Sequence, residues 1–309
     1  MGTVRKLNAA RQGVTLAAAK AAYLATLDHP EAKGTKRMYA SVLGRLAGRF
    51  GEASDLDSIT PEALAAWFGD TWGQKAPATW NVALDAIRSA CRFWADQGWL
   101  SSDPAAMLRR RKTAPDRTRA LSRTDVERLL TDPKHSLRDR TLWRMLYETA
   151  ARSAEVLRLD VADLDMPNRR ARVRRKGGAQ DVIVWQTGTA TLLPRLLKGR
   201  KTGPVFVTGR KARVALPPAD LDEYGHARLS YRQAEDIFKA ATLATLGKAA
   251  TLHQLRHSAL THEAEQGTNT AMLMGKSGHT SVRSLVRYAR VSAEALQRHQ
   301  EASDPARRR

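Results

Sequence analysis

The stretch that decides the fold lies near the carboxyl end of the chain, at residues 251–288: TLHQLRHSALTHEAEQGTNTAMLMGKSGHTSVRSLVRY. Its first part is predicted to be a helix that begins at or near Thr251. On such a helix His253, Arg256 and His257 are three and four residues apart, so their side chains share one face. A guanidinium and a pair of imidazoles are therefore expected to project together.

The second part of the stretch is predicted to bring a tyrosine to the same place. Gly267 ends the helix, a short helix follows, and the Gly278-His279 pair marks a turn before a helix that carries Tyr288. Guanidinium groups bind the non-bridging oxygens of a phosphodiester, imidazoles move protons or donate hydrogen bonds, and a phenol is a nucleophile. The combination therefore favours attack on a phosphodiester.

The order and spacing of these residues resemble the signature of the tyrosine recombinases, the phage integrase family: His-x-Leu-Arg-His, then Gly-His, then a tyrosine. Tyr288 stands nine positions after His279, as in that signature. The resemblance implies that Tyr288 is the nucleophile, that His253 transfers a proton and that His279 donates a hydrogen bond to the phosphate. His257 matches a histidine that the family often has, and a packed structural histidine is an equal interpretation of it.

A second motif, ARSAEVL at residues 151–157, resembles the first box of the family. The resemblance implies that Arg152 is the first catalytic arginine and that Glu155 supports it or caps its helix. An isolated arginine at a helix start would favour a surface ion pair. Together, Arg152 and Arg256 are expected to clamp the equatorial oxygens of a phosphorane-like transition state, because guanidinium groups are always charged and bind in a bidentate manner.

A basic turn, RRKGG at residues 174–178, lies between two strand-like runs. It resembles the β-hairpin of the family, whose turn lysine enters the minor groove and protonates the leaving 5′ oxygen. Lys176 takes that role by position, and a solvated basic turn is the alternative. Arg174 and Arg175 are predicted to touch DNA phosphates.

The net charge of the chain also indicates nucleic acid as its partner. The chain has 52 Lys and Arg against 31 Asp and Glu, a formal net charge of +21, which attracts polyanions such as nucleic acid. The single cysteine, Cys91, cannot form an internal disulfide and is predicted to be buried. No apolar run approaches membrane-spanning length and no signal-peptide core is present, so the sequence predicts a cytoplasmic protein with no membrane partner. The family resemblance implies that the protein is bacterial and DNA-associated.

The predicted fold class is mainly α: an N-terminal all-helical bundle, then a C-terminal mixed α catalytic domain with a small antiparallel β-sheet. The predicted divisions are a flexible basic N-terminus at 1–14, a helical core-binding domain at 15–108, a linker at 109–120 and the catalytic domain at 121–309. The linker lacks apolar periodicity, and its basic residues are predicted to contact the DNA backbone or, alternatively, only solvent. These residues are Arg109, Arg110, Arg111 and Lys112.

Helix and strand signals can be assigned along both domains. In the first domain, helices are expected at 15–28, from a Thr35 cap to Gly51, from Thr60-Pro61, at 77–97, and briefly from Asp103-Pro104. In the second domain, helices are expected from Ser122, at 137–150, at 189–198 and from Ser230. Extended runs are expected near 161–164, 170–174, 181–185 and 205–207, with a long loop at 216–228.

The resemblance implies a reaction that needs no cofactor. Attack by Tyr288 would give a 3′-phosphotyrosine and a free 5′ hydroxyl, and a partner strand's hydroxyl would then reverse the step. The run Met274-Gly275-Lys276-Ser277 is not a P-loop, because Thr270 stands where that motif needs glycine. No His-Glu-x-x-His motif is present, so no metal site is predicted.

The resemblance also implies partners: double-stranded DNA, further copies of the chain on that DNA in a synaptic tetramer, and an accessory DNA-bending or directionality protein. A Xer-type or mobile-element recombinase would use them for integration, excision or dimer resolution. A C-terminal helix at 292–302 either docks on a neighbouring protomer or packs on its own domain. Two other interpretations are a type IB topoisomerase that relaxes supercoils and a DNA-binding regulator that kept the fold without cutting.

Overall fold

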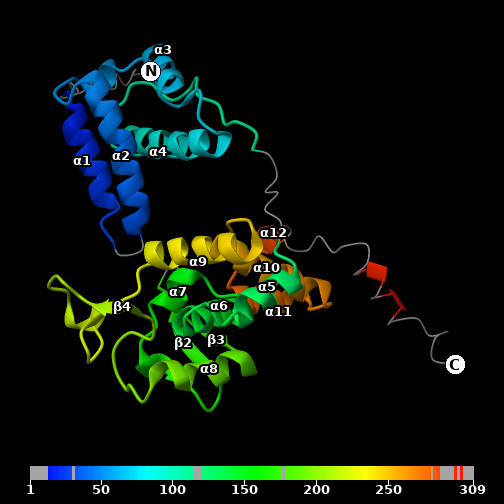
Figure 1. Ribbon diagram of the computed structural model, residues 1–309. Coiled ribbons are helices and arrows are strands. Elements are labelled where there is room, and N and C mark those ends of the chain that lie inside the picture. Colours follow the sequence, from blue (N-terminus) through cyan, green and yellow to red (C-terminus); the bar gives the residue numbers. More distant parts are fainter. Residues whose placement is uncertain are drawn as a thin grey trace, which may run out of the picture. The chain divides into compact units, whose positions relative to one another are not determined.

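The computed structural model describes residues 13–29, 32–113, 120–175, 178–279, 281–285, 296–297 and 300–301. The chain divides into two compact units, Met1–Pro115 and Asp116–Arg309. Helices dominate both units, and the strands belong to the second one (Figure 1). The mainly α fold class with small antiparallel sheets is therefore confirmed.

The first unit is a helical bundle. Its elements are α1 (Leu16–Thr26), α2 (Lys33–Phe50), the 3-10 turn η2 (Leu56–Ser58), α3 (Pro61–Trp72) and α4 (Pro77–Asp96). The α3 start is the one that the sequence predicts: the Thr60 hydroxyl accepts from the Ala63 amide at 3.2 Å, and Pro61 needs no donor in the first turn. Apolar side chains of the helices meet in one core, with Phe68 and Trp94 fully buried.

Two details of the predicted bundle are wrong. Thr35 does not cap α2, because the helix already begins at Lys33 with Ala32 at its N-cap, and no side chain caps it there. Asp103-Pro104 begins turns and not a helix. The Asp103 side chain accepts from the Ala105 amide at 2.8 Å, which holds the chain in a local turn that does not propagate.

The second unit contains the remaining described elements. Its helices and 3-10 turns are α5 (Arg123–Thr131), α6 (Leu137–Thr149), α7 (Ser153–Leu157), η3 (Val161–Asp163), α8 (Thr187–Leu197), η4 (Pro218–Asp220), α9 (Tyr231–Leu246), α10 (Leu252–Glu265), α11 (Thr270–Ser277) and α12 (Val282–Leu285). The predicted caps at the starts of α5 and α9 are present: Ser122 accepts from the Asp125 amide at 3.0 Å, and Ser230 forms a capping box with Gln233.

Two antiparallel sheets complete the unit. The first has the order β1-β2-β3, from β1 (Leu164–Asp165), β2 (Arg170–Arg174) and β3 (Gln180–Val184); the second pairs β4 (Val207–Lys211) with β5 (His226–Arg228). The strand expected from Val161 begins only at Leu164, because Asp160 and Asp163 cap the 3-10 turn η3 first: the Asp160 amide donates to Asp163 at 2.9 Å.

The second sheet corrects the loop that the sequence predicts at 216–228. Asp222 folds a tight turn by accepting from the amides of Tyr224 at 3.0 Å and His226 at 2.8 Å. Gly225 lies in this turn at φ +83°, a conformation that glycine adopts without steric cost. The returning chain then pairs with β4 as β5.

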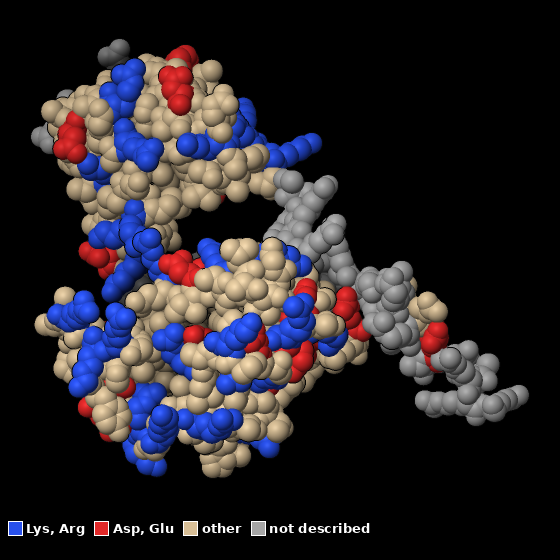
Figure 2. All heavy atoms as spheres, viewed as in Figure 1, with Lys and Arg blue, Asp and Glu red and all other residues tan. Residues whose placement is uncertain are grey.

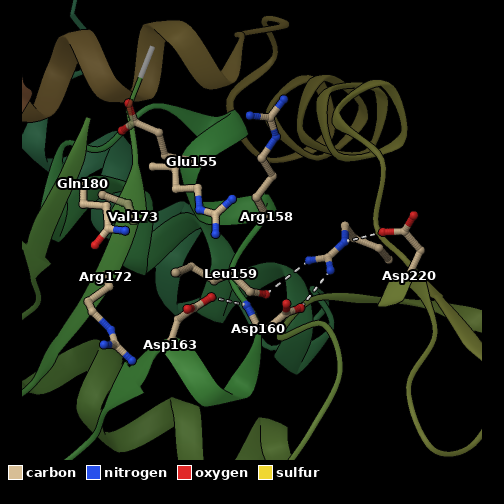
Figure 3. A pocket seen from close by; sticks show the side chains of 11 residues that line it. Glu155, Arg158, Leu159, Asp160, Asp163, Arg172, Val173, Gln180 and Asp220 are labelled. Carbon is tan, nitrogen blue, oxygen red and sulfur yellow. Dashed lines mark hydrogen bonds and ion pairs between the residues drawn. The ribbon is translucent and has the colours of Figure 1, made fainter. Parts of the chain in front are cut away.

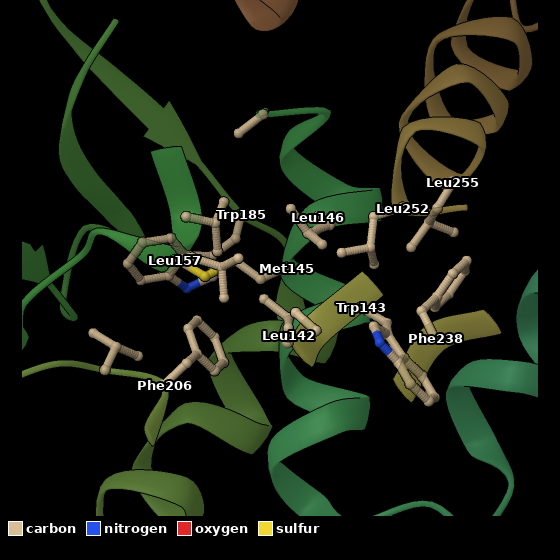
Figure 4. Packing of buried hydrophobic residues seen from close by; sticks show 14 of the residues in the cluster. Leu142, Trp143, Met145, Leu146, Leu157, Trp185, Phe206, Phe238, Leu252 and Leu255 are labelled. Carbon is tan, nitrogen blue, oxygen red and sulfur yellow. The ribbon is translucent and has the colours of Figure 1, made fainter. Parts of the chain in front are cut away.

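The core of the second unit lies between the first sheet and the helices (Figure 4). Trp143 of α6 and Phe238 of α9 pack with ring centroids 5.3 Å apart at 73°, an edge-to-face arrangement. Leu252 and Leu255 of α10 join the same cluster and are fully buried. This packing fixes α10, the helix that carries the candidate site, against the rest of the unit. Within the described residues no helix has the length and apolar character needed to cross a membrane.

Candidate active site

Arg152 lies where α6 gives way to α7. Ala150 ends α6 in the left-handed conformation, at φ +49°, which is uncommon for a residue other than glycine. This reversal places Arg152 at the N-cap of α7. Glu155 then holds the arginine at both ends: its Oε2 accepts from the Arg152 amide at 3.0 Å and its Oε1 accepts from Arg152 Nη1 at 2.9 Å. Glu155 is buried, whereas 39% of the Arg152 side chain stays exposed and so can meet a ligand.

Arg256 lies on α10, one helical turn from the cap at Thr251. Its side chain is buried and its guanidinium is oriented by backbone carbonyls: Nη1 donates to Ala150 and Nη2 donates to Ser277 at 2.7 Å. The first contact ties α10 to the C-cap of α6, two residues before Arg152. The second ties it to the end of α11.

The turn after α11 carries His279. Asn269 caps α11 by accepting from the Met272 amide at 2.9 Å, and Gly278 ends it at φ +63°. The His279 ring Nδ1 lies 2.7 Å from the hydroxyl of the buried Ser277. A hydrogen bond of this kind fixes the orientation of an imidazole ring.

Both arginines converge on this turn. Arg256 donates to the carbonyl of Ser277 at 2.7 Å, and Arg152 Nη2 lies 3.5 Å from the carbonyl of Gly278. Arg152 and Gly278 are 126 positions apart in the sequence. The structure therefore brings Arg152, Arg256 and His279 to one place.

The remaining histidines of the motif share α10 with Arg256. His253 is exposed in the first turn of that helix and His257 is half-buried. His262, one turn further on, is buried; burial lowers the pKa of its imidazole, and its Nδ1 lies 2.7 Å from the Tyr147 hydroxyl. His262 is thus a packed residue.

The β2–β3 hairpin separates Arg174 from Arg175. Arg174 is exposed, as predicted for a phosphate contact, but Arg175 is buried and its guanidinium is engaged by the protein. Strand alternation is the sequence signal that reveals this: β2 exposes Arg170, Arg172 and Arg174 and buries the residues between them. Arg175 occupies the next inward position.

Arg174 also lines a cavity of about 620 Å³ beside the hairpin. Figure 3 shows residues that line it. Glu155 lies in α7 and Arg158 is the C-cap of that helix, while Arg172 lies in β2 and Gln180 in β3. Among the described residues, the side chains of Arg158, Arg172 and Arg174 find no hydrogen-bond or ion-pair partner, and each residue is exposed. Their charges are available to an anion.

The described part of the linker is anchored to the first unit. Trp80 Nε1 donates to the carbonyl of Arg109 at 2.9 Å, and the Arg111 guanidinium lies 3.8 Å over the Trp80 ring. Arg110 forms an ion pair with Asp85. In the linker, Arg109, Arg110 and Lys112 are exposed and Arg111 is half-buried.

Two predicted catalytic residues, Lys176 and Tyr288, lie outside the described residues, as do most of the C-terminal helix expected at 292–302 and the N-terminus up to residue 12. Among the residues that are described, no group of three or more His, Cys, Asp or Glu has an arrangement that could hold a metal ion. Patches of Lys and Arg are spread over the visible face of both units, where Asp and Glu are fewer (Figure 2).

Comparison with known proteins identifies the class. Residues 119–295, more than half of the chain, match the phage integrase family. A curated relative, tyrosine recombinase XerC of Mycobacterium bovis (strain BCG / Pasteur 1173P2), is 31% identical over 292 residues, which span 88% of this chain and 92% of that protein. The chain therefore belongs to the phage integrase family, the tyrosine-type site-specific recombinases. A second relative, XerC of Mycobacterium sp. (strain KMS), is 29% identical over 92% of this chain and 96% of its own length.

Solved structures share the fold. A lambda integrase (75–356) dimer bound to a COC′ core site matches with a TM-score of 0.69 at 15% identity, over 91% of this chain and 97% of that one. The Tn1549 transposon integrase in complex with circular intermediate DNA matches with a TM-score of 0.68 at 16% identity, over 93% and 99% of the two chains.

Proposed function

We propose that this chain cleaves and rejoins double-stranded DNA at specific sites through a 3′-phosphotyrosyl intermediate. The observation that carries the proposal is the convergence of Arg152 and Arg256 on the Ser277–Gly278 turn, beside His279. Guanidinium groups held in advance by Glu155 and by backbone carbonyls can stabilise the charge that develops on a reacting phosphate, without reorganising at the moment of reaction.

The proposed reaction is a pair of transesterifications. The Tyr288 oxygen forms a bond to phosphorus as the bond from phosphorus to the 5′ oxygen breaks. His253 is proposed to take the proton from the phenol, whose pKa is about 10 when free, and Lys176 to protonate the leaving oxygen. A 5′ hydroxyl of a partner strand then attacks the phosphotyrosine and releases Tyr288. Each step exchanges one phosphodiester bond for another, so the reaction needs no external energy source.

The proposed partners follow from charge and from the relatives. The net charge of +21 and the unpaired Arg158, Arg172 and Arg174 favour the DNA backbone as ligand. We propose that the first unit is a core-binding domain and the second the catalytic domain, and that copies of the chain assemble on DNA, as the lambda integrase dimer does on its core site. The proposed location is the bacterial cytoplasm.

Covalent trapping tests the function. Nicked duplexes tiled across the DNA that flanks the encoding gene would be incubated with the full chain, and protein–DNA adducts would be separated on denaturing gels. We expect an adduct with wild type and none with Tyr288→Phe, because the variant lacks only the attacking oxygen. Tight binding without any adduct on these duplexes would contradict the proposal and favour a regulator that does not cut.

A further inference from the structure

We propose that Arg175 is a positioning residue for DNA cleavage: its buried guanidinium sets Glu155, and through it Arg152, against the Gly278 turn. This inference rests on the proposed function, since it concerns the same reaction. It assigns to Arg175 a role different from the phosphate contact that its position in a basic hairpin predicts.

The strand geometry directs Arg175 inward. In β2 the buried residues are Ala171 and Val173, and Arg175 continues this alternation, with only 9% of its surface exposed. A buried guanidinium is costly unless carboxylates and carbonyls surround it. Arg175 meets this condition through several elements of the second unit.

These contacts reach the elements that carry predicted catalytic residues. Arg175 Nε donates to Asp181 of β3, the strand that follows the Lys176 turn. Its Nη2 lies 3.4 Å from the carbonyl of Gly275 in α11, the helix that leads to His279. Its Nη1 lies 3.6 Å from Glu155 Oε2. One side chain thus touches β3, α7 and α11.

The contact with Glu155 is the one that bears on chemistry. Glu155 Oε1 accepts from Arg152 Nη1 at 2.9 Å, so the carboxylate stands between two guanidinium groups. Arg175 Nη1 finds no hydrogen-bond partner among the described residues and is buried, so this charge acts on Glu155 electrostatically. Without Arg175, Glu155 loses one of the two cations that fix its orientation, and Arg152 loses a fixed partner.

Gly278 shows how tightly Arg175 fits. A Cβ placed on Gly278 would overlap Arg175 Nη1, far inside contact distance. The guanidinium therefore packs directly against the turn whose carbonyl faces Arg152. In this position it occupies space inside the protein and does not reach an outer surface where a DNA backbone would lie.

The experiment separates positioning from binding. The DNA duplex that gives the wild-type adduct would be used to measure affinity at several salt concentrations and the single-turnover cleavage rate at saturating protein. For Arg175→Ala we expect cleavage to fall by about 10- to 100-fold, with affinity and salt dependence within about twofold of wild type. Arg174→Ala is the matched control on the adjacent, exposed position. It should lower the slope of log affinity against log salt by about one, which is the change that Arg175→Ala should not show.

A second substrate identifies the step that Arg175 serves. A bridging sulfur in place of the 5′ oxygen leaves without needing a proton, because a thiol has a pKa of about 8.5. We expect the loss in Arg175→Ala to be equal on the sulfur and oxygen substrates, since Arg152 stabilises the phosphate in both. Lys176→Ala serves as the control whose loss disappears on sulfur.

Three results would contradict the role proposed for Arg175. It is overturned if Arg175→Ala lowers the salt slope by about one, if it cleaves like wild type, or if the sulfur substrate restores its rate. Asp181→Asn keeps Arg175 but removes the carboxylate charge that its Nε contacts, so this variant provides the test if Arg175→Ala does not fold. Unchanged cleavage in Asp181→Asn would also contradict the inference. Absence of any wild-type adduct would instead reject the proposed function.

Discussion

Glu155 holds Arg152 at two points, with Oε1 on its guanidinium at 2.9 Å and Oε2 on its backbone amide at 3.0 Å. One carboxylate thus caps α7 and orients the arginine that begins it. Because Glu155 is buried and Arg152 is partly exposed, the pair presents a fixed cation to solvent. The local helix start and the orientation of the proposed catalytic arginine depend on the same side chain.

Replacing this carboxylate is the first prediction. Glu155→Gln removes the negative charge between Arg152 and Arg175 and turns one acceptor into a donor. Charge-assisted hydrogen bonds contribute about 1.5–3 kcal/mol, so we expect single-turnover cleavage to fall by roughly 10- to 100-fold at saturating DNA. Glu223→Gln, at an exposed position, is the control and should cleave like wild type. Equal rates in both variants would show that Glu155 does not orient Arg152.

Gly278 gives the second prediction. In Gly278→Ala the new Cβ meets Arg175, and the residue must stay at φ +63°, which costs about 1–2 kcal/mol for a residue with a side chain. We expect a lower melting temperature and slower cleavage. Adding Arg175→Ala should restore part of the stability, because it removes the clash but not the backbone strain.

Gly275→Ala is the matched control, since no described atom lies within 4 Å of its Cβ position in α11. Thermal unfolding of the single and double variants provides the measurement. Strictly additive losses in Gly278→Ala and Arg175→Ala would contradict the close contact between these residues.

The third prediction concerns Arg111, whose guanidinium stacks on Trp80 and donates to the Gly73 carbonyl at 2.7 Å. We expect Arg111→Ala to lower the free energy of unfolding of the first unit by about 2 kcal/mol, from the lost cation–π contact and hydrogen bond. Arg109→Ala should leave stability unchanged, because only its backbone carbonyl is bound by Trp80. Urea unfolding followed by tryptophan fluorescence compares them; equal stability of the two variants would contradict the anchoring role.

The fourth prediction is a pH dependence. Burial raises the pKa of the Cys91 thiol to about 12, with the Asp103 charge adding to the effect. An unfolded thiol titrates at about 8.5, so above that pH the unfolded state loses a proton that the folded state keeps. The stability from this group is complete below about pH 8.5 and decreases as the pH rises toward 12.

Cys91→Ala isolates this contribution from those of lysines and tyrosines. The free energy of unfolding of wild type, relative to Cys91→Ala, should fall by about 2 kcal/mol between about pH 8 and about pH 10. Urea titrations at both values give the difference. Parallel pH profiles would show that the folded protein does not hold the thiol protonated.

Several elements of the fold could be predicted because their signals are local. Thr60-Pro61, Ser122 and Ser230 begin helices where the sequence predicts them, and Gly278 makes the turn before His279. A cap or a glycine acts on amides only a few residues away, so neighbouring residues suffice to specify it. The β4–β5 pairing was missed because it depends on the turn that Asp222 makes with amides further along the loop.

The sequence by itself determined the order and spacing of Arg152, Arg256 and His279, and with them the family and the expected chemistry. Only the tertiary structure decided what surrounds these residues. Arg256 reaches the carbonyl of Ala150 across 106 positions, and Arg175 turns inward to Glu155 although the preceding residue, Arg174, is basic and exposed. Such contacts depend on how α7, α10 and α11 pack against one another. Packing brings together segments that are far apart in the sequence, and the local sequence of one segment does not specify which other segment it will contact.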